Sequence, residues 1–150
     1  MRSALEMRAL RYLARREYSR LELERKLSAH DRSLAPAILA EVLDKLECEG
    51  VLSTERAAEQ IIRSSRARFG SRRIIHALKE KGIDAACIQE ALPSLKETEQ
   101  GAAFAVWQKK FAKSPESKEE WGKQMRFMMN RGFSIDVIRH VLSRACEENE

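Results

Sequence analysis

The stretch FMMNRGFSIDVIRHVL (residues 127–142) has the same pattern as HALKEKGIDAACIQEAL (residues 76–92). Each has an apolar run with helical spacing, then a cation, a glycine, an apolar residue and a second apolar run. A cation followed by a glycine is typical of a helix C-terminus, because the cation complements the helix dipole and the glycine adopts a left-handed conformation. We therefore predict the same helix–turn–helix unit twice, with its turns at Gly82 and Gly132.

The pattern extends into the N-terminal third of the chain. Leu27 aligns with Leu78 and Tyr18 with Phe69, while Asp31 takes the place of the turn glycine. The sequence thus predicts an all-α fold made of three tandem three-helix repeats, residues 1–50, 51–97 and 98–150. Since no repeat buries its apolar stripe alone, the three are expected to stack into an elongated, curved helical array.

The helical pattern predicts nine helices, at residues 3–16, 19–29, 34–48, 54–68, 71–81, 85–95, 98–113, 116–130 and 135–147. Ser19 and Glu22 have the spacing of a capping box. Ser114 and Pro115 are expected to be the N-cap and the first helical residue of the eighth helix. No window shows the sustained alternation of a strand.

Composition limits the classes to which the chain can belong. It is 43% hydrophobic and 34% charged, which is typical of a soluble folded protein, and no run of about 18 apolar residues predicts a membrane span. Its three cysteines are far apart and odd in number, which argues against a disulfide framework and favours a reducing compartment. We expect a cytoplasmic protein that acts as a monomer.

Charge alternates along the chain with the period of the repeat. Residues 1–33, 63–81 and 109–131 have net charges of +4, +6 and +4, and the segments between and after them are acidic. If the repeats stack in register, the middle helices would form one basic stripe suited to a polyanion, either nucleic acid or an acidic protein surface. The alternative is that each run is only a solvated face.

The densest basic block is RSSRARFGSRRI, residues 63–74. Arginine favours bidentate contacts with phosphate or carboxylate, and a helix that starts at Gly70–Ser71 adds free amide donors. An anion is expected to bind there. The alternative is that these arginines keep the repeat soluble or form local ion pairs.

Catalytic motifs are not found in the sequence. It has no CxxC, HExxH or phosphate loop, and its three histidines are far apart in the sequence. We therefore expect neither enzymatic activity nor a cofactor or metal.

Three segments together resemble the RecX family of bacterial recombination regulators: YLARREYSRLELERKL (12–27), RFGSRRIIHALKEKGI (68–83) and KQMRFMMNRGFSIDVIRHVL (123–142). The resemblance extends from about residue 4 to residue 145. One departure is the segment TERAA at the start of the second repeat, where family members often have D-x-x-[FY]-A.

The resemblance implies a non-enzymatic regulator that binds the RecA–DNA filament and inhibits recombinase, ATPase and co-protease activities. It supplies no list of contact residues, so the predicted contacts rest on charge: Arg16, Arg20, Arg25, Lys26, Arg66, Arg68, Arg72, Arg73, Lys123, Arg126 and Arg131. The alternatives are a protein that binds DNA directly and non-specifically through its basic stripe, and a scaffold for another acidic partner.

Overall fold

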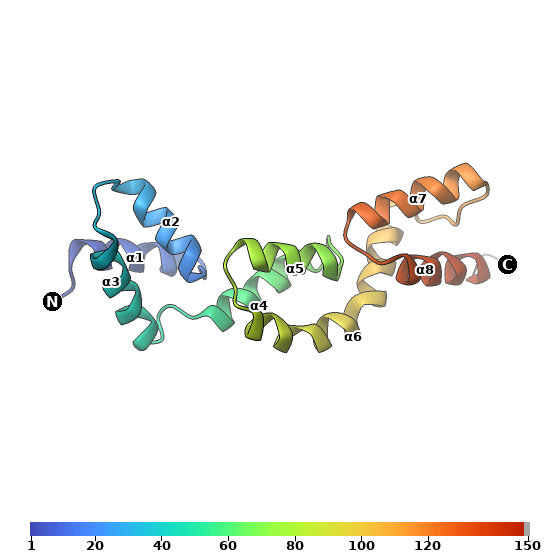
Figure 1. Cartoon of the computed structure of the whole chain (residues 1–150). Helices are drawn as coiled ribbons and strands as arrows, with labels where there is room; N and C mark the ends of the chain where they lie inside the picture. Colours follow the sequence, from blue (N-terminus) through green and yellow to red (C-terminus); the bar gives the residue numbers. More distant parts are fainter. Residues whose placement is uncertain (149–150) are drawn as a thin grey trace. The chain divides into compact units, whose positions relative to one another are not determined.

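The computed structural model describes residues 1–148, which contain helices and no strand (Figure 1). This confirms the predicted all-α class. The helices are α1 (Ala4–Arg15), α2 (Arg20–His30), α3 (Pro36–Cys48), α4 (Thr54–Ser65), α5 (Ser71–Glu80), α6 (Ala85–Lys110), α7 (Lys118–Asn130) and α8 (Ile135–Glu148).

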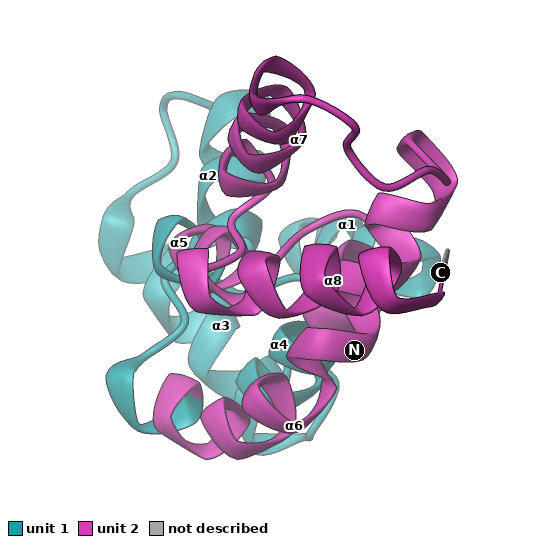
Figure 2. Cartoon of the chain, turned by 90° about the vertical axis from the view of Figure 1, so that its right-hand side faces the viewer, with its two compact units in different colours: residues 1–60, 78–87 teal, residues 61–77, 88–150 magenta. Residues whose placement is uncertain are grey.

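The chain divides into two compact units (Figure 2). Unit 1 comprises residues 1–60 and 78–87, and unit 2 comprises residues 61–77 and 88–150. Helix α5 is divided between the units, since it begins in unit 2 and ends in unit 1.

Unit 1 has its core between α1, α2 and α3. Leu23 and Leu27 of α2 are fully buried against Leu43 and Leu46 of α3, and Ala9 of α1 completes this contact. Each buried leucine side chain contributes about 1.5–3 kcal/mol to folding.

Unit 2 has a second core between α6, α7 and α8. Trp107 of α6 and Met128 of α7 are buried together with Phe133, Ile138 and Leu142. The residues of FMMNRGFSIDVIRHVL that are spaced as an apolar stripe thus form much of this core.

The predicted turn glycines have the predicted conformation. Gly82 has a φ of 76° and Gly132 a φ of 96°. After each glycine the chain is closed by a backbone hydrogen bond to the last helical turn, as Ile83 N–H donates to the Leu78 carbonyl at 3.0 Å. A third turn of this kind, at Gly50 with a φ of 75°, follows α3 and was not predicted.

Several helix ends differ from the prediction by one to three residues, and two differences matter most. The N-cap of α7 is Ser117 rather than Ser114, because the Ser117 hydroxyl accepts from Glu120 N–H at 3.1 Å. The two helices expected at residues 85–95 and 98–113 form one continuous helix, α6, with Pro93 inside it.

Pro93 lacks the N–H that would donate to the carbonyl four residues before it, which belongs to the exposed Gln89. Two carbonyls after the proline accept hydrogen bonds from side chains. The Thr98 hydroxyl donates to the Ser94 carbonyl at 2.9 Å, and Arg66 Nη2 donates to the Leu95 carbonyl at 3.1 Å. Arg66 directly follows α4, so its hydrogen bond to the Leu95 carbonyl cannot be predicted from the sequence around Pro93.

Candidate partner-binding surface

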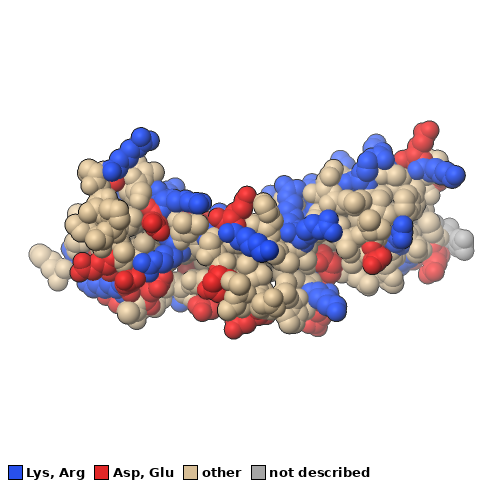
Figure 3. Space-filling view, viewed as in Figure 1, with Lys and Arg blue, Asp and Glu red and all other residues tan. Residues whose placement is uncertain are grey.

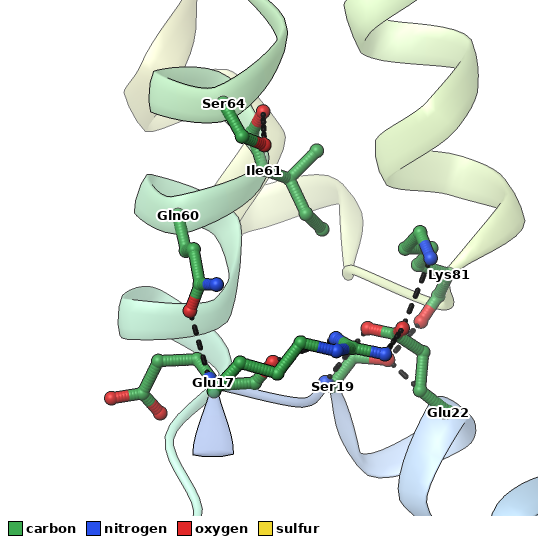
Figure 4. A network of polar contacts seen from close by, with 8 residues as sticks. Glu17, Ser19, Glu22, Gln60, Ile61, Ser64 and Lys81 are labelled. Atoms are coloured by element: carbon green, nitrogen blue, oxygen red, sulfur yellow. Dashed lines mark hydrogen bonds and ion pairs between the residues drawn. The ribbon is translucent and has the colours of Figure 1, made fainter.

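In unit 1 the start of α2 lies against the turn that ends α5. The Ser19 hydroxyl donates to the Lys81 carbonyl at 2.5 Å, and a Cβ on Gly82 would lie 2.8 Å from the Leu21 Cβ. Figure 4 shows Ser19, Glu22 and Lys81 directed toward one another at this contact. We call this contact the first joint: residues 16–22 with Lys81 and Gly82.

Glu22 is the anion at the centre of the first joint. It accepts from Ser19 N–H at 3.1 Å, which completes the predicted capping box, and it pairs with Lys81 Nζ at 3.0 Å and Arg16 Nη2 at 3.1 Å. Burial raises the pKa of Glu22, but the hydrogen bonds from Lys81 and Ser19 and the charges of Lys81 and Arg16 outweigh this effect and lower the pKa overall. The first joint therefore contains its own counter-ion.

In unit 2 the start of α5 lies in the same way against the turn that ends α7. Gly70 N–H donates to the Arg131 carbonyl at 2.7 Å, and Arg72 N–H donates to the Gly132 carbonyl at 3.2 Å. A Cβ on Gly70 would lie 2.4 Å from the Gly132 carbonyl carbon, so the two backbones touch. We call this contact the second joint: residues 68–73 with Arg131 and Gly132.

The predicted anion site on the amides of Gly70 and Ser71 is wrong. Gly70 N–H is used by the Arg131 carbonyl, and Ser71 N–H donates to both carboxylate oxygens of Glu99, at 3.0 and 3.2 Å. The Ser71 hydroxyl also contacts Glu99. The anion at the start of α5 is thus a side chain of the protein itself.

The cations of the second joint gather around aromatic rings. Guanidinium carbons lie 4.1 Å (Arg73), 5.1 Å (Arg68) and 5.5 Å (Arg131) from the centre of the Phe69 ring. Arg131 also lies 5.1 Å from the Phe127 ring. These distances are within the range of cation–π attraction.

A hollow of about 280 Å³ lies beside these rings, lined by Ala67, Arg68, Val106, Lys109, Lys110, Phe127 and Arg131. Its lining includes four cations and no carboxylate. Figure 3 shows Lys and Arg atoms gathered on unit 2 between the start of α5 and α7. The structure thus brings Arg68, Arg73 and Arg131 together, as a basic surface requires.

The predicted contact residues of the first repeat have different surroundings. Arg16 stacks on the Tyr18 ring at 3.6 Å, and Arg25 and Lys26 are exposed beside it in a hollow of about 450 Å³. Arg20, by contrast, is paired with two carboxylates, at 2.7 Å from Asp44 and 3.2 Å from Glu47.

Arg66 differs most from what the sequence suggested. Its side chain is only 16% exposed and lies 3.6 Å from Glu99, which is itself 13% exposed. Two of its nitrogens, Nε and Nη1, are buried without a hydrogen-bond partner. Burial lowers the pKa of Arg66 while Glu99 raises it, but a guanidinium stays charged at neutral pH. Arg66 is therefore a mostly buried residue of unit 2 that pairs with Glu99.

The remaining predicted residues lie on the surface of unit 2. Arg72, Lys123 and Arg126 are exposed, on α5 and α7. Selection by charge density omitted three cations. Lys109 and Lys110, at the end of α6, line the hollow, and Lys81 belongs to the first joint. Lys81 could have been found from its alignment with Arg131 before the turn glycine.

Within residues 1–148, no group of three His, Cys, Asp or Glu side chains is placed to hold a metal ion. Over the same range, no helix is both long and apolar enough to cross a membrane. Cys48 and Cys146 are exposed thiols, and Cys87 is half-buried.

Two family models match the chain: "RecX, second three-helix domain" over residues 55–92 and "RecX, third three-helix domain" over residues 97–142. A "Regulatory protein RecX" of Leptothrix cholodnii is 42% identical over 98% of this chain and 92% of its own length. That of Ralstonia pickettii is 40% identical over 96% of this chain and 89% of its own.

A solved structure has a similar fold. The crystal structure of RecX from Lactobacillus salivarius superimposes with a TM-score of 0.78 at 21% identity, over 95% of each chain. The two family models together cover residues 55–92 and 97–142, and the similarity to the relatives extends over nearly all of the chain. By these matches, the chain belongs to the RecX family of regulatory proteins.

Proposed function

We propose that the chain binds the RecA–DNA filament and inhibits the recombinase, ATPase and co-protease activities of RecA. The observation that carries this proposal is the 42% identity, over 98% of the chain, to a protein named Regulatory protein RecX. In this proposal the chain acts as a cytoplasmic monomer, catalyses no reaction and needs no cofactor.

We propose that the contact surface consists of cations of the two joints, of α2 and of α7. The exposed ones are Arg16, Arg25 and Lys26 in unit 1 and Arg68, Arg72, Arg73, Lys123 and Arg126 in unit 2; Arg131 is half-buried beside them. Most of these cations have no carboxylate partner of their own among residues 1–148, so the charge is available to an acidic partner. Arg20 and Arg66 contribute less, because each is held by carboxylates of its own unit.

The test is RecA ATPase activity on single-stranded DNA, measured with increasing amounts of the protein. We expect inhibition by the wild type and weaker inhibition by the double variant Arg72→Glu/Arg73→Glu. The matched control is Arg139→Glu, the same charge reversal at an exposed site on α8. Absence of inhibition by wild-type protein in excess contradicts the function. Full inhibition by the double variant removes only the second joint from the contact.

A second candidate is direct, non-specific binding to DNA. The observation that favours it is the proximity of Arg68, Arg73 and Arg131 to the rings of Phe69 and Phe127, since cations beside aromatic rings suit a single strand. This binding should occur without RecA and fall steeply as salt rises. Fluorescence anisotropy of a labelled oligonucleotide in a salt series distinguishes it from filament binding.

A further inference from the structure

Helices α2, α5 and α7, which correspond to the middle helices of the three predicted repeats, differ at the third residue after the N-cap. The caps of α2, α5 and α7 are Ser19, Gly70 and Ser117. Three residues beyond the cap, α2 has Glu22 and α7 has Glu120, an acid that is favourable in the first turn of a helix. Only α5 has a cation there, Arg73.

The acid at this position neutralises the first joint. Glu22 lies 3.1 Å from Arg16 and 3.0 Å from Lys81, so one carboxylate connects the residues before α2 with the turn that ends α5. In the second joint Arg131 corresponds to Lys81, and Arg73 replaces the acid. An attractive pair in one joint is therefore a pair of like charges in the other.

The protein compensates these like charges only in part. Arg73 Nη1 donates to the Asn130 carbonyl at 3.1 Å, and Arg131 Nη1 donates to the Arg68 carbonyl at 3.3 Å. Phe69 attracts all three guanidinium groups through its ring. Within residues 1–148, none of the three arginines forms an ion pair with a carboxylate.

We propose that the second joint is a phosphate-binding site, in which a phosphate oxyanion takes the place that Glu22 has in the first joint. Arg68 and Arg131 line the hollow together with Lys109 and Lys110, and Arg73 lies beside them over the Phe69 ring. Neighbouring guanidinium groups suit a phosphate oxyanion, because their N–H groups donate to its oxygens in pairs and their charge compensates it. This inference does not rest on RecA.

The phosphate has two possible sources with the same chemistry. One is free inorganic phosphate or pyrophosphate, and the other is the backbone phosphate of a single-stranded polynucleotide. Phe127 lines the hollow and presents a ring on which a base could stack. Binding of a polynucleotide should therefore gain from stacking of a base on Phe127, whereas binding of free phosphate should not.

The experiment is a titration of the full-length chain, without RecA, with pyrophosphate and separately with a short oligothymidine, at constant ionic strength. The deciding variant is Arg73→Glu, which gives α5 the acid that α2 and α7 have. The control is Arg139→Glu, an equal charge change at an exposed residue of α8 in the same unit, outside the proposed contact surface.

We expect wild type and Arg139→Glu to bind, and Arg73→Glu to bind about tenfold more weakly or not at all, as the loss of a charge-assisted hydrogen bond predicts. Arg131→Gln should show the same loss, and far-UV circular dichroism should show both variants folded. Binding of the oligonucleotide alone identifies a backbone phosphate; binding of both identifies a general phosphate site.

Three outcomes overturn the proposal. The first is equal binding by Arg73→Glu and Arg139→Glu, which would place the phosphate elsewhere. The second is the absence of binding by the wild type to either ligand. The third is binding of an acidic peptide such as oligoglutamate with neither phosphate ligand bound, which would assign the joint to carboxylates. Each can occur whether or not the chain inhibits RecA, so failure here is distinct from failure of the proposed function.

Discussion

Gly70 and Gly132 are in backbone contact, since a Cβ on Gly70 would lie 2.4 Å from both the carbonyl carbon and the carbonyl oxygen of Gly132. Gly132 is equally restricted from its own side, where a Cβ would lie 2.6 Å from the Arg73 Cβ. The turn after α7 thus has two reasons for its glycine: a φ of 96° and the start of α5 lying against it. The turn at Gly82 has the same two reasons in unit 1, where Leu21 lies against it.

Replacing either glycine of this contact should destabilise the protein strongly. For Gly132→Ala we expect a loss of about 2–4 kcal/mol, because strain at a positive φ adds to a clash with backbone. Gly70→Ala should lose a similar amount through the clash alone. Urea denaturation followed by circular dichroism measures both.

Two other glycines serve as controls. Gly50→Ala has the positive φ with nothing within 4 Å, so we expect a loss of only about 1 kcal/mol. Gly101→Ala lies within α6, also with nothing within 4 Å, and should stabilise the protein by about 0.5–1 kcal/mol. If Gly132→Ala cost no more than Gly50→Ala, the close contact would have no energetic role.

Gln124 of α7 is a buried polar residue in the core of unit 2. Its Oε1 accepts from Trp107 Nε1–H at 2.8 Å, and its Nε2 donates to the Lys113 carbonyl at 3.1 Å. Gln124→Leu should therefore destabilise the protein by about 1–3 kcal/mol, because a buried indole N–H loses its partner. The control is Gln108→Leu, at an exposed site of α6. Tryptophan fluorescence during denaturation is the measurement, and equal midpoints for the two variants would contradict the prediction.

Arg66 depends on Glu99 for compensation of its partly buried charge. Glu99→Gln should destabilise the protein by about 2–3 kcal/mol, somewhat less than for a fully buried pair, because both side chains keep some exposure. Glu97→Gln, at an exposed site of the same helix, should change stability by less than about 0.5 kcal/mol. Thermal unfolding compares the two, and the idea fails if they are equally stable.

The first joint should weaken in acid because of Glu22. Its pKa is lowered from the ordinary value of 4.5, so its stabilising contribution is present above that pH and is lost as the pH falls through the lower, folded-state pKa. Glu22→Gln should therefore be less stable than wild type at pH 7, and the gap should close below about pH 4.5. Glu24→Gln, exposed on the same helix, is the control. A gap that stays constant from pH 7 to pH 3 would exclude this role.

Local patterns were sufficient for most helices and turns. The capping box at Ser19 and the left-handed glycines at 82 and 132 follow from interactions over three to five residues, which a sequence displays directly. Boundaries were less secure where two candidates lie close together, as with Ser114 and Ser117. The break expected after Leu95 was wrong: α6 continues, and the Leu95 carbonyl also accepts a hydrogen bond from Arg66, 29 residues away.

The sequence by itself determined the helices, the repeat of the turn and the excess of cations around the middle helices, since these depend on neighbouring residues and on composition. Tertiary structure decided how each charge is used. It placed Glu99 on the Ser71 amide of α5 and buried Arg66 beside it, and it brought Arg73 and Arg131 to the same Phe69 ring. The physical reason is that burial and neutralisation depend on groups about 30 to 60 residues apart, whose distances no local pattern contains.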